Sequence, residues 1–178
     1  MRPDTLARLA AVLAVLVALT LAAALWTRPP KPAALVPATL ADDAVRLALD
    51  GPAGRVTLER QKAGWTMVGS TQAADGSMVQ DVLGKLSKAT LSGPVTEDPE
   101  RYGLFGFSAS SATRVKIASA KATAALEFYV GKDGPDYPSA FVRVAGQTGV
   151  FELSGVSAFE LTRAPAEWLK KETPPAKN

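Results

Sequence analysis

The chain has 178 residues, of which 47% are hydrophobic and 21% are charged, a composition typical of a globular protein rather than a disordered or polytopic membrane protein. It contains no cysteine and no histidine, which excludes disulfides, thiolate chemistry and the commonest general base and transition-metal ligand. The net charge of +3 belongs to the first 32 residues, which hold four basic side chains and one acidic one, whereas the remainder holds 16 of each. The neutral remainder gives no electrostatic reason to expect nucleic acid as a partner.

An uncharged stretch runs from Leu9 to Trp26 and would be about 27 Å long as an α-helix, close to the thickness of a hydrocarbon core. We therefore expect residues 1–28 to be an N-terminal membrane anchor containing a single transmembrane helix. Its representative apolar residues are Leu9, Leu16, Leu21 and Trp26. A signal peptide cleaved after Ala24 is the alternative, since three alanines there would satisfy a small-residue cleavage site.

The short basic tail before this stretch favours an anchor whose N-terminus stays in the cytoplasm. We expect the protein at the inner (cytoplasmic) membrane, single-pass, with the C-terminal domain in the periplasm or otherwise outside the cytoplasm. Its partners would be the lipid bilayer and other envelope proteins. Residues 29–40 are rich in proline and alanine and predict a semi-rigid linker.

The next part of the chain predicts three strands and one helix. Apolar and polar residues alternate at 45–49 and 56–58 around a Gly/Pro-containing turn at 50–54, which indicates a β-hairpin. Residues 65–67 predict a third strand with a core-facing tryptophan. From Asp75 to Ala89 the apolar spacing changes to three and four, which predicts an amphipathic helix with an N-terminal cap at Asp75 or Ser77.

A second group of strands and helices follows the region from Gly93 to Gly106. The strands are expected at 115–117, 126–130, 141–144 and 149–153. Helices are expected at 157–162 and from Pro165 onward, and residues 172–178 predict a disordered tail. The predicted fold class is α+β: an N-terminal single transmembrane helix followed by a mainly antiparallel sheet domain, residues 41–171, in two strand-then-helix cycles.

Several short pieces of this order of elements resemble one known family. They are Gly64-Trp65, a helix with Leu83 and Leu86, Tyr102-Gly103-Leu104, Val130-Gly131, and FVRV followed by VFEL at residues 141–153. Over about residues 40–171 the chain resembles the DUF4340 family, a domain of unknown function in bacterial membrane-associated proteins. A proline that commonly follows the Tyr-Gly-Leu step is replaced here by Phe105-Gly106-Phe107-Ser108.

The resemblance implies a binding or scaffolding role rather than a reaction, because the family offers no catalytic residues to carry over. Its relatives are similar to accessory proteins encoded beside ABC-type transport systems of the gliding-motility kind. We therefore expect a membrane-anchored, envelope-facing, non-enzymatic binding or assembly module without a cofactor. ABC transporter subunits would be among its partners.

Two acidic segments could carry chemistry instead. The loop Lys132–Tyr137 holds two carboxylates that could bind a hard cation, but it lacks the alternation and distal glutamate of a calcium loop, which favours a solvated hairpin turn. Glu97, Asp98 and Glu100 could supply the acid and base of a hydrolase acting on an envelope polymer, or simply form a helix-initiating acidic turn. A third function, binding of an apolar ligand such as a lipid chain, would require an internal cavity.

The most distinctive stretch alternates glycines with large apolar residues. It contains Tyr102, Leu104, Phe105 and Phe107. Glycines at such spacing allow bulky side chains to fold into a core corner, so one interpretation is a structural latch between the two cycles. The other is a partly exposed aromatic surface for a partner. Trp65 and Trp168 are expected in the core, because tryptophans bury large apolar areas.

Overall fold

The computed structural model describes residues 13–14, 16–20, 33–108, 110–121 and 124–171. The chain divides into two compact units, Met1–Lys31 and Pro32–Asn178. In the first unit the described residues, 13–14 and 16–20, are helical. The second unit carries the sheet and the remaining helices.

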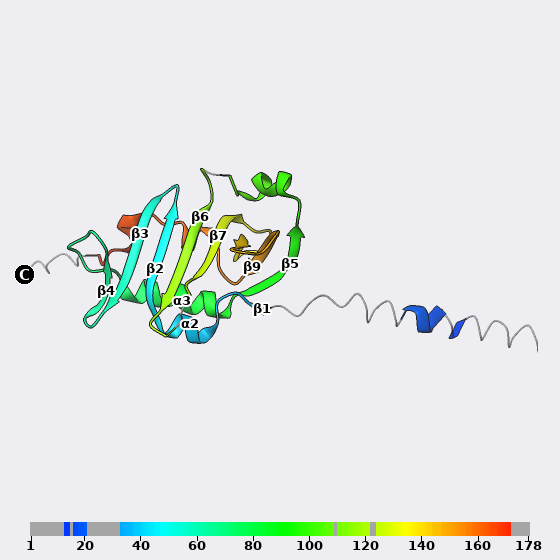
Figure 1. Ribbon diagram of the computed structural model, residues 1–178, viewed down its shortest axis with the longest axis horizontal. Coiled ribbons are helices and arrows are strands. Elements are labelled where there is room, and N and C mark those ends of the chain that lie inside the picture. Colours follow the sequence, from blue (N-terminus) through cyan, green and yellow to red (C-terminus); the bar gives the residue numbers. More distant parts are fainter. Residues whose placement is uncertain (1–12, 15, 21–32, 109, 122–123, 172–178) are drawn as a thin grey trace, which may run out of the picture. The chain divides into compact units, whose positions relative to one another are not determined.

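The second unit is built on one sheet in the order β1-β5-β9-β8-β7-β6-β2-β3-β4 (Figure 1). Every neighbouring pair of strands is antiparallel. The strands are β1 (Ala33–Ala34), β2 (Ala44–Gly51), β3 (Gly54–Gln61), β4 (Gly64–Met67), β5 (Thr90–Thr96), β6 (Thr113–Ser119), β7 (Leu126–Asp133), β8 (Ser139–Val144) and β9 (Val150–Ser154). The helices are α2 (Ala38–Asp42), α3 (Gly76–Lys88) and α4 (Ala158–Leu161), with 3₁₀ helices η1 (Pro99–Phe105) and η2 (Pro165–Trp168).

The β2–β3 hairpin forms where the alternation of apolar residues predicts it. In its register Leu47 faces Leu58 and Leu49 faces Val56, and all four side chains are buried. Because side chains alternate across a strand, one face of the hairpin points into the core and the other carries the polar partners. The turn at the end of the hairpin spans Gly51 to Gly54.

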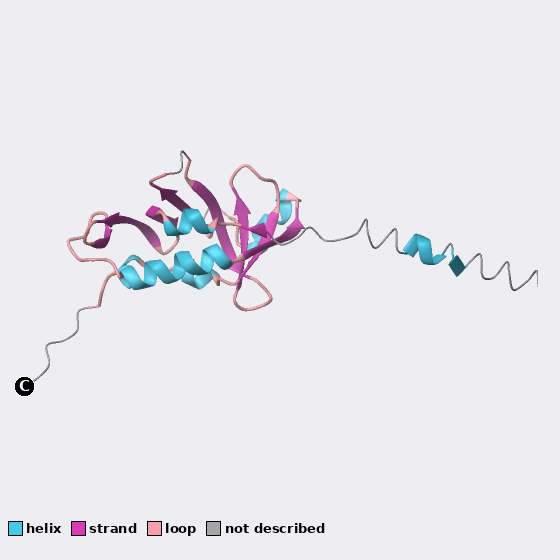
Figure 2. Cartoon of the chain, turned by 90° about the horizontal axis from the view of Figure 1, so that it is seen from below, coloured by secondary structure: helices cyan, strands magenta, loops and turns pink. Residues whose placement is uncertain are grey.

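Helix α3 supplies the opposite side of the core, and Figure 2 shows this helix, the longest among the described residues, running along one face of the sheet. The Asp75 side chain caps it by accepting hydrogen bonds from the backbone N–H groups of Ser77 and Met78. Its buried residues recur at a spacing of three and four: Val79, Val82, Leu83 and Leu86. The predicted amphipathic helix with its cap at Asp75 is confirmed.

The predicted fold class is wrong in two respects. Strands precede α3 and again precede α4 along the chain, but they do not form two separate cycles: β6 pairs with β2, and β9 pairs with β5, so both groups of strands lie in one antiparallel sheet with few, short helices. The alternation of apolar and polar residues identifies a strand but not the strand with which it pairs. If each group formed its own sheet, the strands at the junction would be edges with unpaired N–H and C=O groups, and joining one sheet gives those groups hydrogen bonds.

The predicted transmembrane helix is also without support in the part of the chain that the structure describes. Among the described residues, no helix combines the length and the apolar character needed to cross a membrane. Of the predicted anchor residues, Leu16 is described and exposed, whereas Leu9, Leu21 and Trp26 lie outside the described residues.

The sheet unit takes in part of the segment for which a linker was predicted. Ala33–Ala34 forms β1, which pairs with β5, and α2 follows at Ala38–Asp42. Leu35 and Val36 from this segment belong to the buried core. The predicted tail, residues 172–178, lies outside the described residues.

Candidate functional site

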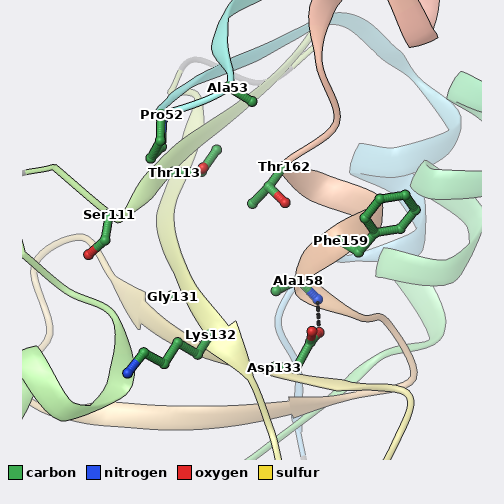
Figure 3. A pocket seen from close by; sticks show the side chains of 10 residues that line it. All are labelled: Pro52, Ala53, Ser111, Thr113, Gly131, Lys132, Asp133, Ala158, Phe159 and Thr162. Carbon is green, nitrogen blue, oxygen red and sulfur yellow. Dashed lines mark hydrogen bonds between the residues drawn. The ribbon is translucent and has the colours of Figure 1, made fainter.

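An open pocket of about 520 Å³ lies where the β2–β3 turn, the start of β6, the end of β7 and α4 meet (Figure 3). Its lining residues are Pro52, Ala53, Ser111, Thr113, Gly131, Lys132, Asp133, Ala158, Phe159 and Thr162. The Thr113 side chain is only 3% exposed, and its hydroxyl has no hydrogen-bond partner in the described part of the chain. The Phe159 ring is 62% exposed, with the Arg163 guanidinium 5.5 Å from its centroid. The pocket thus combines a polar wall with an exposed aromatic rim.

The charged residues of the pocket are held by backbone groups rather than by each other. Asp133 Oδ1 accepts a hydrogen bond of 2.7 Å from the N–H of Ala158, the first residue of α4 (Figure 3). The Lys132 side chain turns the other way and donates to the Leu104 carbonyl at 3.2 Å. These contacts join β7 to α4 on one side and to η1 on the other.

The loop for which a cation site was considered contributes no cluster of ligands. Asp133 bonds the start of α4, and Asp136 is exposed. Within the described ranges, no group of three or more acidic side chains is arranged to hold a metal ion. The loop gains its order from Gly134, whose N–H donates to the Ser139 carbonyl at 2.9 Å.

The segment singled out as a latch or a partner surface follows β5 and packs on the sheet face opposite α3. The Phe105 ring meets the Phe141 ring edge-on, with centroids 4.8 Å apart. The Tyr102 hydroxyl accepts a 3.0 Å hydrogen bond from the N–H of Gly149. Gly106 ends the 3₁₀ helix at φ +89°, a conformation that glycine adopts without strain. Tyr102, Phe105 and Phe107 are partly buried, whereas Leu104 is 68% exposed.

The three carboxylates considered for hydrolysis precede this segment in the chain. Glu97, Asp98 and Glu100 are all exposed, and none of them lines the pocket. Asp98 accepts a 3.0 Å hydrogen bond from the Glu100 N–H and thereby caps η1. Their observed contacts are those of a helix-initiating acidic turn.

Charged side chains on the same face as η1 form cross-strand pairs that sequence reasoning did not identify. Glu127 lies between Arg114 Nε at 2.6 Å and Lys116 Nζ at 3.0 Å, and it accepts the Tyr129 hydroxyl at 3.0 Å. The hydrogen bond from Arg114, together with those from Lys116 and Tyr129, lowers the pKa of Glu127 to about 2. Two cations thus surround one ionised carboxylate at this place on the face.

Arg143 on β8 lies beside these pairs. Its guanidinium carbon is 4.3 Å from the centroid of the Tyr102 ring and 5.9 Å from that of Phe107. Its Nε is buried without a hydrogen-bond partner, and no ion pair to it exists among the described residues. The one sequence signal for Arg143 was its polar position within the alternating strand FVRV, which marks a residue facing away from the core.

Both tryptophans singled out in the sequence are core residues. Trp65 on β4 and Trp168 in η2 belong to the buried cluster that also contains the α3 residues. The N–H of Asp75 donates to the Trp168 carbonyl, which ties η2 to the start of α3. The expected core positions of both rings are confirmed.

These features define a single-sheet domain with α3 on one face, a pocket at one end, and a charged second face that η1 covers in part. The family model for a domain of unknown function, DUF4340, matches residues 65–173, and the chain belongs to this family. Searches of the curated proteins and of the solved structures gave no match.

Proposed function

We propose that this chain is a non-enzymatic binding or assembly module that works in the cell envelope, accessory to an ABC-type transport system of the gliding-motility kind. Its partner surface centres on the segment from Tyr102 to Phe107. The inner (cytoplasmic) membrane is its site of action, with the sheet domain outside the cytoplasm. The uncharged sequence from Leu9 to Trp26 and the basic residues that flank it support this location.

The observation that carries the proposal is the exposure of Leu104 on a fixed backbone. Leu104 is 68% exposed, yet its carbonyl accepts a hydrogen bond from Lys132 and its neighbour Phe105 packs on Phe141. An apolar side chain on a fixed backbone costs less conformational entropy to cover than one on a mobile loop, because the backbone is already ordered. Leu104 therefore has the properties of a preorganised contact residue.

Site-specific photo-crosslinking tests this proposal. A photoreactive amino acid replaces Leu104 in the full chain, which is then irradiated in its own membranes. The matched control carries the same amino acid at Lys62, an exposed residue in the β3–β4 turn. We expect adducts with envelope proteins, transporter subunits among them, at position 104 and not at position 62. Identical adducts at both positions, or polymer-degrading activity of the purified chain, would contradict the proposal.

Membrane fractionation tests the location separately. The chain should sediment with the cytoplasmic membrane, and protease added to intact spheroplasts should digest the sheet domain. Recovery of an undigested chain from spheroplasts would place the domain on the cytoplasmic side, and recovery from the supernatant would contradict membrane association.

A second function, binding of an apolar ligand such as a lipid chain, is favoured by one further hollow. It has a volume of about 670 Å³ and lies between α2 and the connection from β6 to β7. The hollow is open to solvent; its apolar lining residues are Pro37, Leu40, Ala124, Ala125 and Leu126, and its polar ones are Thr39, Asp43, Ser119 and Lys121. A fluorescent fatty acid should bind the full chain and lose affinity in Leu40→Glu if this function is right, and equal binding by both proteins would contradict it.

A further inference from the structure

The face of the sheet opposite α3 carries one row of polar side chains that crosses five strands. The register pairs Arg55 with Asp50, Asp50 with Arg114, Arg114 with Tyr129, and Tyr129 with Arg143. The row therefore runs from β3 through β2, β6 and β7 to β8. None of these five side chains is fully buried by the described residues, so a partner can reach this part of the face. We call it the open face.

Positive charge exceeds negative charge on the open face. Its basic side chains are Arg46, Arg55, Arg114, Lys116 and Arg143, and its acidic ones are Asp50, Glu59, Glu127 and, on the neighbouring β9, Glu152 opposite Phe141. Arg46 pairs with Glu59, and Arg55 pairs with Asp50 at 2.7 Å. Those two pairs, at the β2–β3 end, are balanced. The excess positive charge lies at the other end of the row, around Tyr129.

Two positive charges near Tyr129 lack a carboxylate of their own. Arg114 and Lys116 share Glu127, so one of the two charges is uncompensated. Arg143 has aromatic rings as neighbours and no carboxylate among the described residues. The rings of Tyr102 and Phe107 fix the guanidinium in place, which reduces the entropy lost when it forms directional hydrogen bonds.

We propose that the open face around Tyr129 binds an acidic protein segment, whose carboxylates supply the counter-charges that Arg143 and the Arg114–Lys116 pair lack. This inference rests on the proposed binding function and adds the chemistry of the partner. Arg114 and Arg143 are two strands apart, which separates their backbones by about 10 Å and sets the spacing of the two carboxylates. Arginine held flat by aromatic rings suits the bidentate geometry of a carboxylate.

The partly buried position of these cations favours a protein over a membrane surface. Arg143 is partly buried between its rings, and its Nε is fully covered. Anionic lipid headgroups attract long, freely exposed basic side chains that are clustered in number. A recessed guanidinium instead requires an acceptor delivered at a defined place, as a folded or extended protein segment can do.

A direct binding experiment uses the full chain in mild detergent and a fluorescent copolymer of glutamate and tyrosine as the acidic probe. Fluorescence anisotropy should show binding that weakens with salt. Arg143→Gln and Lys116→Gln should each reduce affinity roughly tenfold, since each removes a charge-assisted hydrogen bond. Lys62→Gln removes the same charge from an exposed turn outside the open face and should leave affinity within about twofold.

Three results would overturn the inference: no binding of the copolymer, equal losses in Lys62→Gln and Arg143→Gln, or Arg143-dependent binding to phosphatidylglycerol vesicles without binding to the copolymer. Lys116→Gln distinguishes a loss of binding from a folding defect caused by Arg143→Gln, because the Lys116 side chain is 42% exposed and its replacement should not disturb packing. Crosslinking from position 104 keeps the two proposals apart. Adducts that persist unchanged in Arg143→Gln would overturn this inference and leave the binding function standing, whereas failure of the position-104 adducts would remove the function itself.

Discussion

The backbone of Gly131 in β7 passes so close to Phe105 that a Cβ atom at residue 131 would lie 2.1 Å from the Phe105 carbonyl oxygen. The ring of Phe107 would be 3.0 Å from the same atom. The segment from Tyr102 to Phe107 can therefore lie on the sheet only where β7 has no side chain. This contact fixes the backbone directly after the exposed Leu104, the residue on which the proposed function depends.

Gly131→Ala should release this segment from the sheet. The overlap with the Phe105 carbonyl forces the backbone to move, and we expect a loss of about 1–3 kcal/mol in the free energy of unfolding. Urea denaturation measures it. Gly84→Ala is the matched control: no atom lies within 4 Å of the new Cβ, and alanine in the middle of α3 should stabilise by roughly 0.5–1 kcal/mol. A Gly131→Ala protein as stable as the wild type would show that the segment tolerates displacement.

Phe105→Ala and Leu104→Ala compare two adjacent apolar residues of one 3₁₀ helix. Phe105 packs edge-on against Phe141, so its truncation should cost about 2 kcal/mol. Leu104 is largely exposed, so its truncation should change stability by less than about 0.5 kcal/mol. Thermal and urea unfolding of both variants provide the comparison. Equal losses would mean that Leu104 is a packing residue and not a contact residue.

Asp75→Ala should destabilise α3 by about 1 kcal/mol, whereas Asp75→Asn should be nearly neutral, because asparagine also caps a helix. The hydrogen bonds from Ser77 and Met78 lower the pKa of Asp75 below its ordinary value. Its contribution to stability is therefore present above the pKa of the unfolded chain, near 3.8, and is lost as the pH falls through the lower folded value. Helix content followed by circular dichroism from pH 7 to pH 2 checks both statements. A pH-independent difference between wild type and Asp75→Asn would contradict the second.

Glu127→Gln should make the free energy of unfolding depend less on pH in the acidic range. The hydrogen bond from Arg114, with those from Lys116 and Tyr129, lowers the pKa of Glu127 from 4.5 to about 2. The stabilisation by Glu127 is thus complete above about pH 4.5 and is lost between there and pH 2. We expect it to amount to about 1–2 kcal/mol after solvent screening.

Urea unfolding at several pH values between 2 and 7 measures this effect. Glu59→Gln is the control on the same face, because Glu59 pairs with Arg46 outside the group around Tyr129. The difference between wild type and Glu127→Gln should shrink as the pH falls below 4.5. A difference that stays constant down to pH 2 would rule out the ionised carboxylate as its source.

Local patterns identified most of the secondary structure and failed on its assembly. The alternation in residues 45–58 predicts the β2–β3 hairpin, and the spacing from Val79 to Leu86 predicts α3 with its cap at Asp75. The same patterns did not show that the strands of both predicted cycles pair within one sheet, because the pairing of β6 with β2 joins segments far apart in the sequence. Strand pairing depends on long-range contacts that periodicity does not encode.

The sites divide in the same way. The glycines and aromatic residues of the sequence mark the segment from Tyr102 to Phe107. They do not show that Leu104 is exposed while Phe105 packs on the sheet, and nothing in the sequence separates Arg143 from other polar strand residues. Exposure and stacking depend on which strand lies under the segment, here β7 at Gly131 and β8 at Arg143. The pocket beside Phe159 was not identified, because its walls come from four separate elements.

By itself the sequence determined the composition that removes histidine and cysteine chemistry, the neutral charge of the region after residue 32, the main strands and α3. These follow from residue identity and from periods of two and 3.6 residues along the chain. The tertiary structure alone decided that the strands form one sheet and that Glu127 is shared by two cations. It also decided that Arg143 lies on the Tyr102 ring and lacks a carboxylate among the described residues. The reason is that charge balance on a sheet face is set by cross-strand neighbours, which are fixed only when the strands pair.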